Sequence, residues 1–157
     1  MKKLLIATSL VLSLNLVGCS SNNEETVKEV PMSEIQTAVN TEELLAIQPF
    51  DSLDAKDFYI FQEVIDNIEE GFVTKAMINV KLQDVFVIKT DDVDAIKAIL
   101  EEYKENELRS FADGYGGEEN ITAVSESILS SKGDYVYFIA APNATEIEQT
   151  ILDMITE

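Results

Sequence analysis

Histidine and tryptophan are absent from this sequence of 157 residues, and cysteine occurs once. Without histidine the chain lacks the usual general base near neutral pH, the histidine-activated serine and cysteine nucleophiles, and the commonest zinc ligand. A single cysteine excludes an intramolecular disulfide bond. No Ser-x-x-Lys, phosphate-binding-loop or dinucleotide-binding glycine pattern occurs. We therefore predict no catalytic residues, no cofactor and no metal ligands, and we expect a protein that is not an enzyme.

Basic residues are also scarce. The chain has 11 lysines and arginines against 30 aspartates and glutamates, a formal net charge of −19. Such a charge repels phosphate backbones, so nucleic-acid binding is excluded. We expect the acidity to keep the protein soluble, and we keep open a basic protein partner or weak calcium binding.

The first residues have the pattern of a secretory signal peptide. Two lysines precede an apolar run over residues 4–14, which is shorter than the roughly 20 residues needed to span a bilayer. The sequence Leu-Val-Gly-Cys at residues 16–19 then resembles a bacterial lipobox. We predict cleavage between Gly18 and Cys19, with diacylglycerol and palmitate attached to Cys19.

These features predict three regions. Residues 1–18 are the lipoprotein signal peptide, residues 19–32 a lipidated flexible tether, and residues 33–157 a single domain. Cleavage leaves nine basic against thirty acidic residues, a net charge of −21. Two or three acyl chains give stable anchoring, so we expect the protein on the extracytoplasmic face of the cell membrane.

Apolar spacing predicts the elements of the domain. Helical spacing predicts one helix from Ser33 towards Ile47 and another through Phe58, Phe61, Ile65, Ile68 and Phe72, separated by a turn at residues 50–54. We expect strands at residues 76–81, 85–88 and 135–141, the last extended into a hairpin by residues 129–131. Further helices are expected over residues 91–114, around 121–128 and over 143–155.

This order predicts an α+β fold: a small antiparallel sheet of three or four strands packed with four or five helices on one face. Alternation places Tyr135 and Tyr137 on one side of the last strand and Phe138 on the other. The tyrosine side is either a contact surface or part of a core that covers both sides of the sheet.

Several residues carry a family resemblance. The long helix running into Phe111 and Tyr115, the Gly-Asp-Tyr-Val sequence at 133–136 and the stretch at 79–85 resemble a domain-of-unknown-function family of short lipoproteins from Gram-positive bacteria. The likeness spans most of residues 33–157. It implies a lipoprotein of unknown function and transfers no catalytic residue.

The best candidate for a ligand site is the glycine-rich loop with acidic flanks. Asp113, Tyr115, Glu118 and Glu119 could hold a cation or another ligand, but they also fit a helix end followed by the acidic first turn of the next helix.

The sequence thus favours a membrane-anchored, non-catalytic binding or interaction module of the cell envelope. A small-solute receptor component of a transporter and a carboxylate-dependent cell-wall hydrolase remain alternatives.

Overall fold

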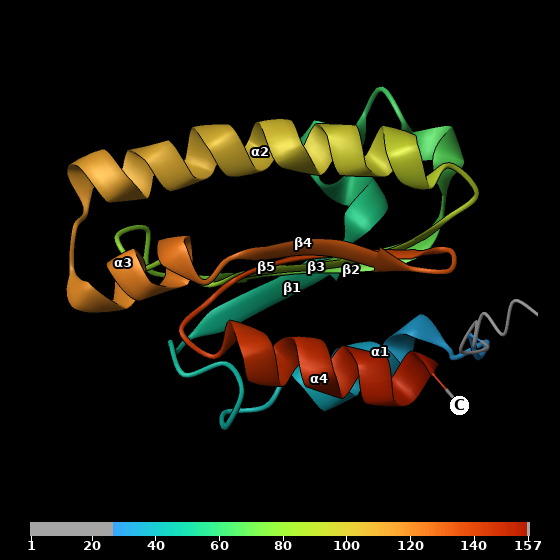
Figure 1. Ribbon diagram of the computed structural model, residues 1–157, viewed down its shortest axis with the longest axis horizontal. Helices are drawn as coiled ribbons and strands as arrows, with labels where there is room; N and C mark the ends of the chain where they lie inside the picture. Colours follow the sequence, from blue (N-terminus) through green and yellow to red (C-terminus); the bar gives the residue numbers. More distant parts are fainter. Residues whose placement is uncertain (1–26, 157) are drawn as a thin grey trace, which may run out of the picture.

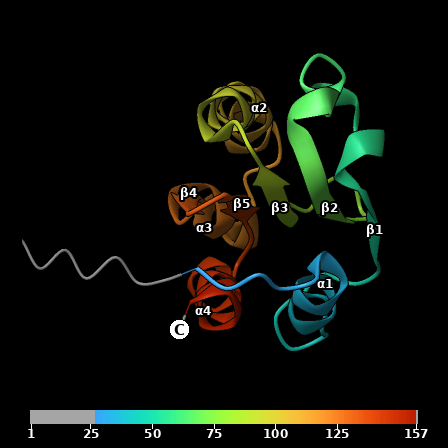
Figure 2. The ribbon, with the colours of Figure 1, turned by 90° about the vertical axis from the view of Figure 1, so that its right-hand side faces the viewer.

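The computed structural model describes residues 27–156, which form a five-stranded antiparallel sheet between two layers of helices (Figure 1). The strand order is β1-β2-β3-β5-β4. The strands are β1 (Phe50–Asp54), β2 (Ile68–Ala76), β3 (Asp84–Thr90), β4 (Ile128–Lys132) and β5 (Tyr135–Ala140). Helix α2 (Val93–Gly114) covers one face, whereas α1 (Met32–Val39) and α4 (Ala144–Ile155) cover the other (Figure 2). The short helix α3 (Glu118–Ser125) lies at one end of the sheet.

The two central strands are buried along their whole length. In β3, Phe86 and Ile88 point into the core beneath α2, and Val85 and Val87 into the core beneath α1 and α4. Strands covered on both faces read as continuous apolar runs, which is why residues 85–88 were recognisable in the sequence.

The predicted tyrosine face is part of a core. Tyr135 and Tyr137 are buried on the side of α1 and α4, and Phe138 is buried on the side of α2. The two-sided core is therefore correct. The alternative of an exposed tyrosine surface was wrong, and so was the prediction that all helices lie on one face. The apolar residues of α1 and α4 pack on the second face of the sheet and bury it.

The antiparallel α+β prediction is confirmed with one strand more than expected. Helix α2 begins at Val93 and is capped by Asp92, whose side chain accepts a hydrogen bond from the Ala95 backbone N–H at 3.0 Å. Strand β4 forms the expected hairpin with β5. Residues 50–54 form edge strand β1 rather than a turn, and residues 77–83 form the connection between β2 and β3 rather than a strand. Helix α1 ends at Val39, well before Ile47.

The predicted helix through Phe58 and Phe72 was wrong. Two 3-10 turns, η2 (Tyr59–Phe61) and η3 (Ile65–Asn67), replace its first part, and its last part is strand β2. A further 3-10 turn, η1 (Ala55–Asp57), precedes them. Phe58 and Phe72 are buried in different cores, on opposite sides of the sheet. One helical stripe cannot serve both sides, so pairing of β2 with β1 and β3 overrides the local spacing.

The described chain starts and ends at the same end of the sheet. Val27 forms a β-bridge with Thr156, and the Lys28 backbone N–H donates to the Ile155 carbonyl at 2.7 Å. Lys89 binds the Glu29 carboxylate, which fixes the segment before α1 against the domain. The β2–β3 connection lies at the opposite end (Figure 1).

Residues 1–26 lie outside the described residues, and with them lie the predicted signal peptide, the lipidation site and the first part of the tether. Within residues 27–156 no helix has the length and apolar character needed to cross a bilayer.

Candidate functional site

A groove of about 490 Å³ lies between α2 and the segment of 3-10 turns. One wall is formed by a single face of α2, because residues three and four apart lie above one another on a helix. The other wall comes from the turns after Phe58. The lining residues are Tyr59, Ile60, Gln62, Glu63, Ile99, Glu102, Tyr103, Asn106 and Glu107.

The groove combines aromatic rings with carboxylates. Tyr59 is 69% exposed, whereas Tyr103, which also lines the groove, is 5% exposed. Glu63 comes from the turns, and Glu102 and Glu107 come from α2. No lining residue is basic, so the groove has negative potential and apolar surface together.

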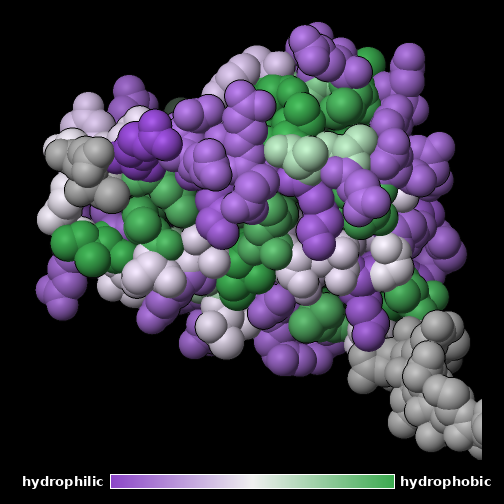
Figure 3. Space-filling view, turned by 45° about the horizontal axis from the view of Figure 1, so that its top comes forward, coloured by the Kyte–Doolittle hydropathy of each residue, from purple (hydrophilic) through white to green (hydrophobic). Residues whose placement is uncertain are grey.

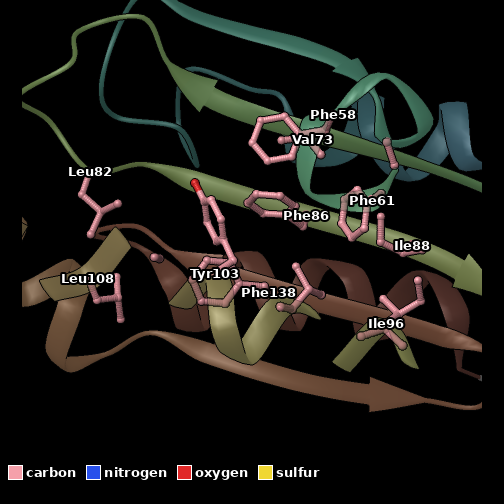
Figure 4. Close-up of a cluster of buried hydrophobic side chains, with 14 of the residues drawn as sticks. Phe58, Phe61, Val73, Leu82, Phe86, Ile88, Ile96, Tyr103, Leu108 and Phe138 are labelled. Atoms are coloured by element: carbon pink, nitrogen blue, oxygen red, sulfur yellow. The ribbon is translucent and has the colours of Figure 1, made fainter. Parts of the chain in front are cut away.

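A polar cluster lies beneath the groove, with Asp84 and Tyr103 buried and Lys75 and Glu107 partly exposed. Lys75 of β2 and Asp84 of β3 are paired in the sheet register, and the Lys75 Nζ lies 2.9 Å from the Asp84 carboxylate. The Tyr103 hydroxyl donates to the same carboxylate at 2.6 Å, and the Glu107 carboxylate lies 3.4 Å from Lys75. Figure 4 shows the Tyr103 ring beside Phe86 and Phe138, packed under α2.

Aromatic rings also contact the lysine. The Lys75 Nζ lies 5.1 Å from the centre of the Tyr103 ring and 5.7 Å from that of Phe58. A cation at such distances is attracted by the negative face of the ring. The base of the groove therefore already stabilises one ammonium group with both carboxylates and rings.

Burial sets the ionisation of this cluster. It raises the pKa of Asp84 above its ordinary value, and the Lys75 cation and the Tyr103 hydrogen bond offset part of the effect. Burial alone lowers the pKa of Lys75, but the charges of Asp84 and Glu107 reverse this and leave it raised. The pKa of the Tyr103 hydroxyl is raised by burial and by Asp84, so it remains protonated as a donor.

The cluster is fully occupied by its own partners. Among the described residues, no buried side-chain nitrogen or oxygen lacks a hydrogen bond. Asp84 and Tyr103 bind each other and Lys75, so they shape the groove from below rather than reach into it. The groups that remain for a ligand are the carboxylates, amides and exposed tyrosine along the walls.

The predicted acidic loop lies at the end of the sheet near α3. Glu118 and Glu119 border a hollow of about 350 Å³ with Lys81, and Glu119 forms an ion pair with Lys81. Tyr115 is exposed and packs against Phe111, with ring centres 5.8 Å apart, whereas the side chain of Asp113 lies outside the described residues. Across the part of the chain that the structure describes, no three acidic, histidine or cysteine side chains are arranged to hold a metal ion.

Sequence reasoning missed the groove. Carboxylates are too frequent in this chain for Glu63 or Glu102 to be singled out, and the wall that carries Tyr59 was assigned to a helix. Tyr59, which lies outside the apolar spacing of Phe58 and Phe61, was the one signal available in the sequence.

Comparison with curated proteins and with solved structures found no match. A family model described as a domain of unknown function, DUF4358, matches residues 40–141. The match covers more than half of the chain and contains the whole sheet, with α2 and α3, but neither α1 nor α4. The chain therefore belongs to the DUF4358 family of domains of unknown function.

Proposed function

We propose that this protein is a lipoprotein of the cell envelope, held on the extracytoplasmic face of the membrane by acyl chains on Cys19, and that its domain acts by binding rather than catalysis. The groove beside α2 receives ammonium or guanidinium groups of a basic partner protein. The observation that carries this proposal is that two exposed carboxylates, those of Glu63 and Glu102, line the groove together with Tyr59 and Tyr103. A third carboxylate in the lining, that of Glu107, already binds Lys75.

Cation binding suits both the shape and the charge of the groove. A lysine or arginine side chain places its apolar stem on the tyrosine rings and its charge among the carboxylates. Lys75 is already stabilised in this way at the base of the groove. The net charge of the chain also attracts basic partners over longer distances.

Binding without catalysis is supported by where the perturbed groups lie. Asp84 has the raised pKa expected of a general acid, but its side chain is 4% exposed and is bound by Lys75 and Tyr103. A hydrolase needs a carboxyl group that reaches its substrate. The groove also lies within one domain, whereas solute receptors usually bind between two lobes.

Titration with trilysine tests the groove. We expect the mature domain to bind trilysine and not triglutamate at fixed ionic strength, measured by calorimetry. Glu63→Gln/Glu102→Gln is expected to weaken trilysine binding about fivefold, because each partly exposed ion pair contributes roughly 0.2–1 kcal/mol.

Glu101→Gln/Glu105→Gln is the matched control, since it removes the same charge from exposed positions of α2 that do not line the groove. This variant is expected to change the affinity less than twofold. Equal losses in both variants would mean that trilysine responds only to the overall charge, and the groove proposal would then be wrong.

The anchor is tested by Cys19→Ser. Because the lipid is attached through the cysteine sulfur, the serine variant is expected to lose incorporation of a fatty-acid analogue and to leave the membrane fraction. A Ser20→Ala variant, with the cysteine intact, is expected to remain labelled. Labelling that persists in Cys19→Ser contradicts the anchor.

A further inference from the structure

Exposed apolar side chains gather at the end of the sheet opposite Val27. Among the described residues, six large apolar or aromatic side chains are exposed, and one of them, Tyr59, belongs to the groove. The other five form what we call the apolar tip: Met77 (59% exposed), Ile78 (39%), Val80 (48%), Tyr115 (49%) and Ile121 (55%). Figure 3 shows apolar surface at the left-hand end of that view, where α3 and the β2–β3 connection lie in Figure 1.

Asn120 holds the two halves of the apolar tip together. Its side chain is buried, and its amide nitrogen donates to the carbonyls of Val80 at 2.8 Å and of Tyr115 at 2.7 Å. Its amide oxygen accepts from the Leu82 backbone N–H at 2.9 Å. The ion pair between Lys81 and Glu119 adds a second link. The apolar side chains are therefore presented on a fixed backbone.

Packing of the domain does not explain these residues. A connection between two antiparallel strands is normally made of polar residues and glycine, because it faces water. Here three of the seven connecting residues, Met77, Ile78 and Val80, are large and apolar and remain exposed. Contiguous exposed apolar residues with charged neighbours mark interaction surfaces.

Two occupants are disfavoured by the molecule itself. The segment that precedes Val27 joins the domain at the far end of the sheet. Strand β2 alone has nine residues, about 30 Å in length. In the proposed mature chain only the eight residues 19–26 precede Val27, and fully extended they span at most about 28 Å. A second copy would bring two chains of net charge −19 together, which mutual repulsion opposes.

From charge complementarity, we infer that the apolar tip docks a segment of another protein that combines apolar side chains with lysine or arginine. The apolar side chains of the segment pack on Val80 and Ile121. Its cations bind the exposed Glu118 carboxylate at the margin and share the Glu119 carboxylate with Lys81. In a chain anchored through Cys19, this surface lies on the side that faces away from the tether.

A short synthetic peptide of alternating leucine and lysine is the probe, with leucine–glutamate and glycine–lysine peptides for comparison. We expect the leucine–lysine peptide to bind most tightly, measured by fluorescence anisotropy. Met77→Ser/Val80→Ser/Ile121→Ser is expected to weaken its binding at least about tenfold, because the leucine side chains of the peptide lose the apolar surface on which they pack. These exposed substitutions leave the fold intact, which thermal unfolding verifies.

Two variants of the groove, Tyr59→Ser and Glu63→Gln/Glu102→Gln, show whether the peptide binds at the apolar tip or in the groove. Both are expected to keep the affinity for the leucine–lysine peptide within twofold of that of the unchanged protein. If binding follows these variants instead, the peptide occupies the groove and the apolar tip is not its site. Equal binding of the leucine–glutamate peptide refutes the charge requirement. If the domain sediments as a dimer and the triple variant does not, the occupant of the apolar tip is a second copy and not another protein. If the domain binds vesicles of phosphatidylcholine and phosphatidylglycerol and the triple variant does not, the occupant is lipid.

Discussion

Phe86→Ala is expected to lower the free energy of unfolding by about 3–5 kcal/mol, a large part of the stability of a domain of this size. The Phe86 side chain is fully buried in the middle of β3. Its ring centre lies 5.0 Å from that of Tyr103, 5.3 Å from Phe58 and 5.7 Å from Phe138. Truncation removes these contacts and leaves a cavity between the sheet and α2 that the surrounding rings cannot fill.

Urea unfolding at neutral pH measures the effect. Phe86→Leu retains most of the volume and is expected to lose clearly less than the alanine variant. Tyr59→Ala truncates an exposed aromatic ring and is expected to change stability by about 0.5 kcal/mol or less. A loss for Phe86→Ala as small as that for Tyr59→Ala would contradict the packing described for this core.

Lys75→Met is expected to cost about 3 kcal/mol at pH 7. The substitution keeps an apolar stem of similar length but leaves the buried Asp84 carboxylate with only the Tyr103 hydroxyl as a partner. Removing one member of a buried ion pair is strongly destabilising, because the other charge remains without compensation. Lys28→Met makes the same chemical change at an exposed position and is expected to cost little.

The cost of Lys75→Met is expected to be smaller at pH 5 than at pH 7. Burial raises the pKa of Asp84, and without the Lys75 cation it rises further, so the folded chain keeps a proton that the unfolded chain releases. The free energy of unfolding of the variant then falls as the pH rises above about 3.9, the pKa of an aspartate in the unfolded chain. The fall is up to about 1.4 kcal/mol per pH unit. Lys75→Met/Asp84→Asn is expected to lose this pH dependence. A Lys75→Met variant with the same loss at both pH values contradicts an isolated carboxyl group at Asp84.

Local patterns were sufficient to predict β3, β5, α2 and α4. The apolar run at residues 85–88, the aspartate that caps α2 and the spacing of Ile147, Ile151 and Ile155 are all features of neighbouring residues. Such features are decided by backbone geometry and burial within one element. The absence of histidine also predicts a function without the usual catalytic groups, and this stays a prediction.

Tertiary structure decided the segment from Phe58 to Phe72 and both candidate surfaces. Strand β2 exists because it pairs on both sides with other strands, and that pairing also brings Lys75 opposite Asp84. The groove needs the 3-10 turns to lie beside α2, and the apolar tip needs Asn120 to bind a connection forty residues earlier in the chain. The apolar spacing from Phe58 to Phe72 indicated a helix, because local spacing does not record which distant strands a segment pairs with. The sequence by itself determined which residues are apolar or acidic. Only the fold determined which of them meet.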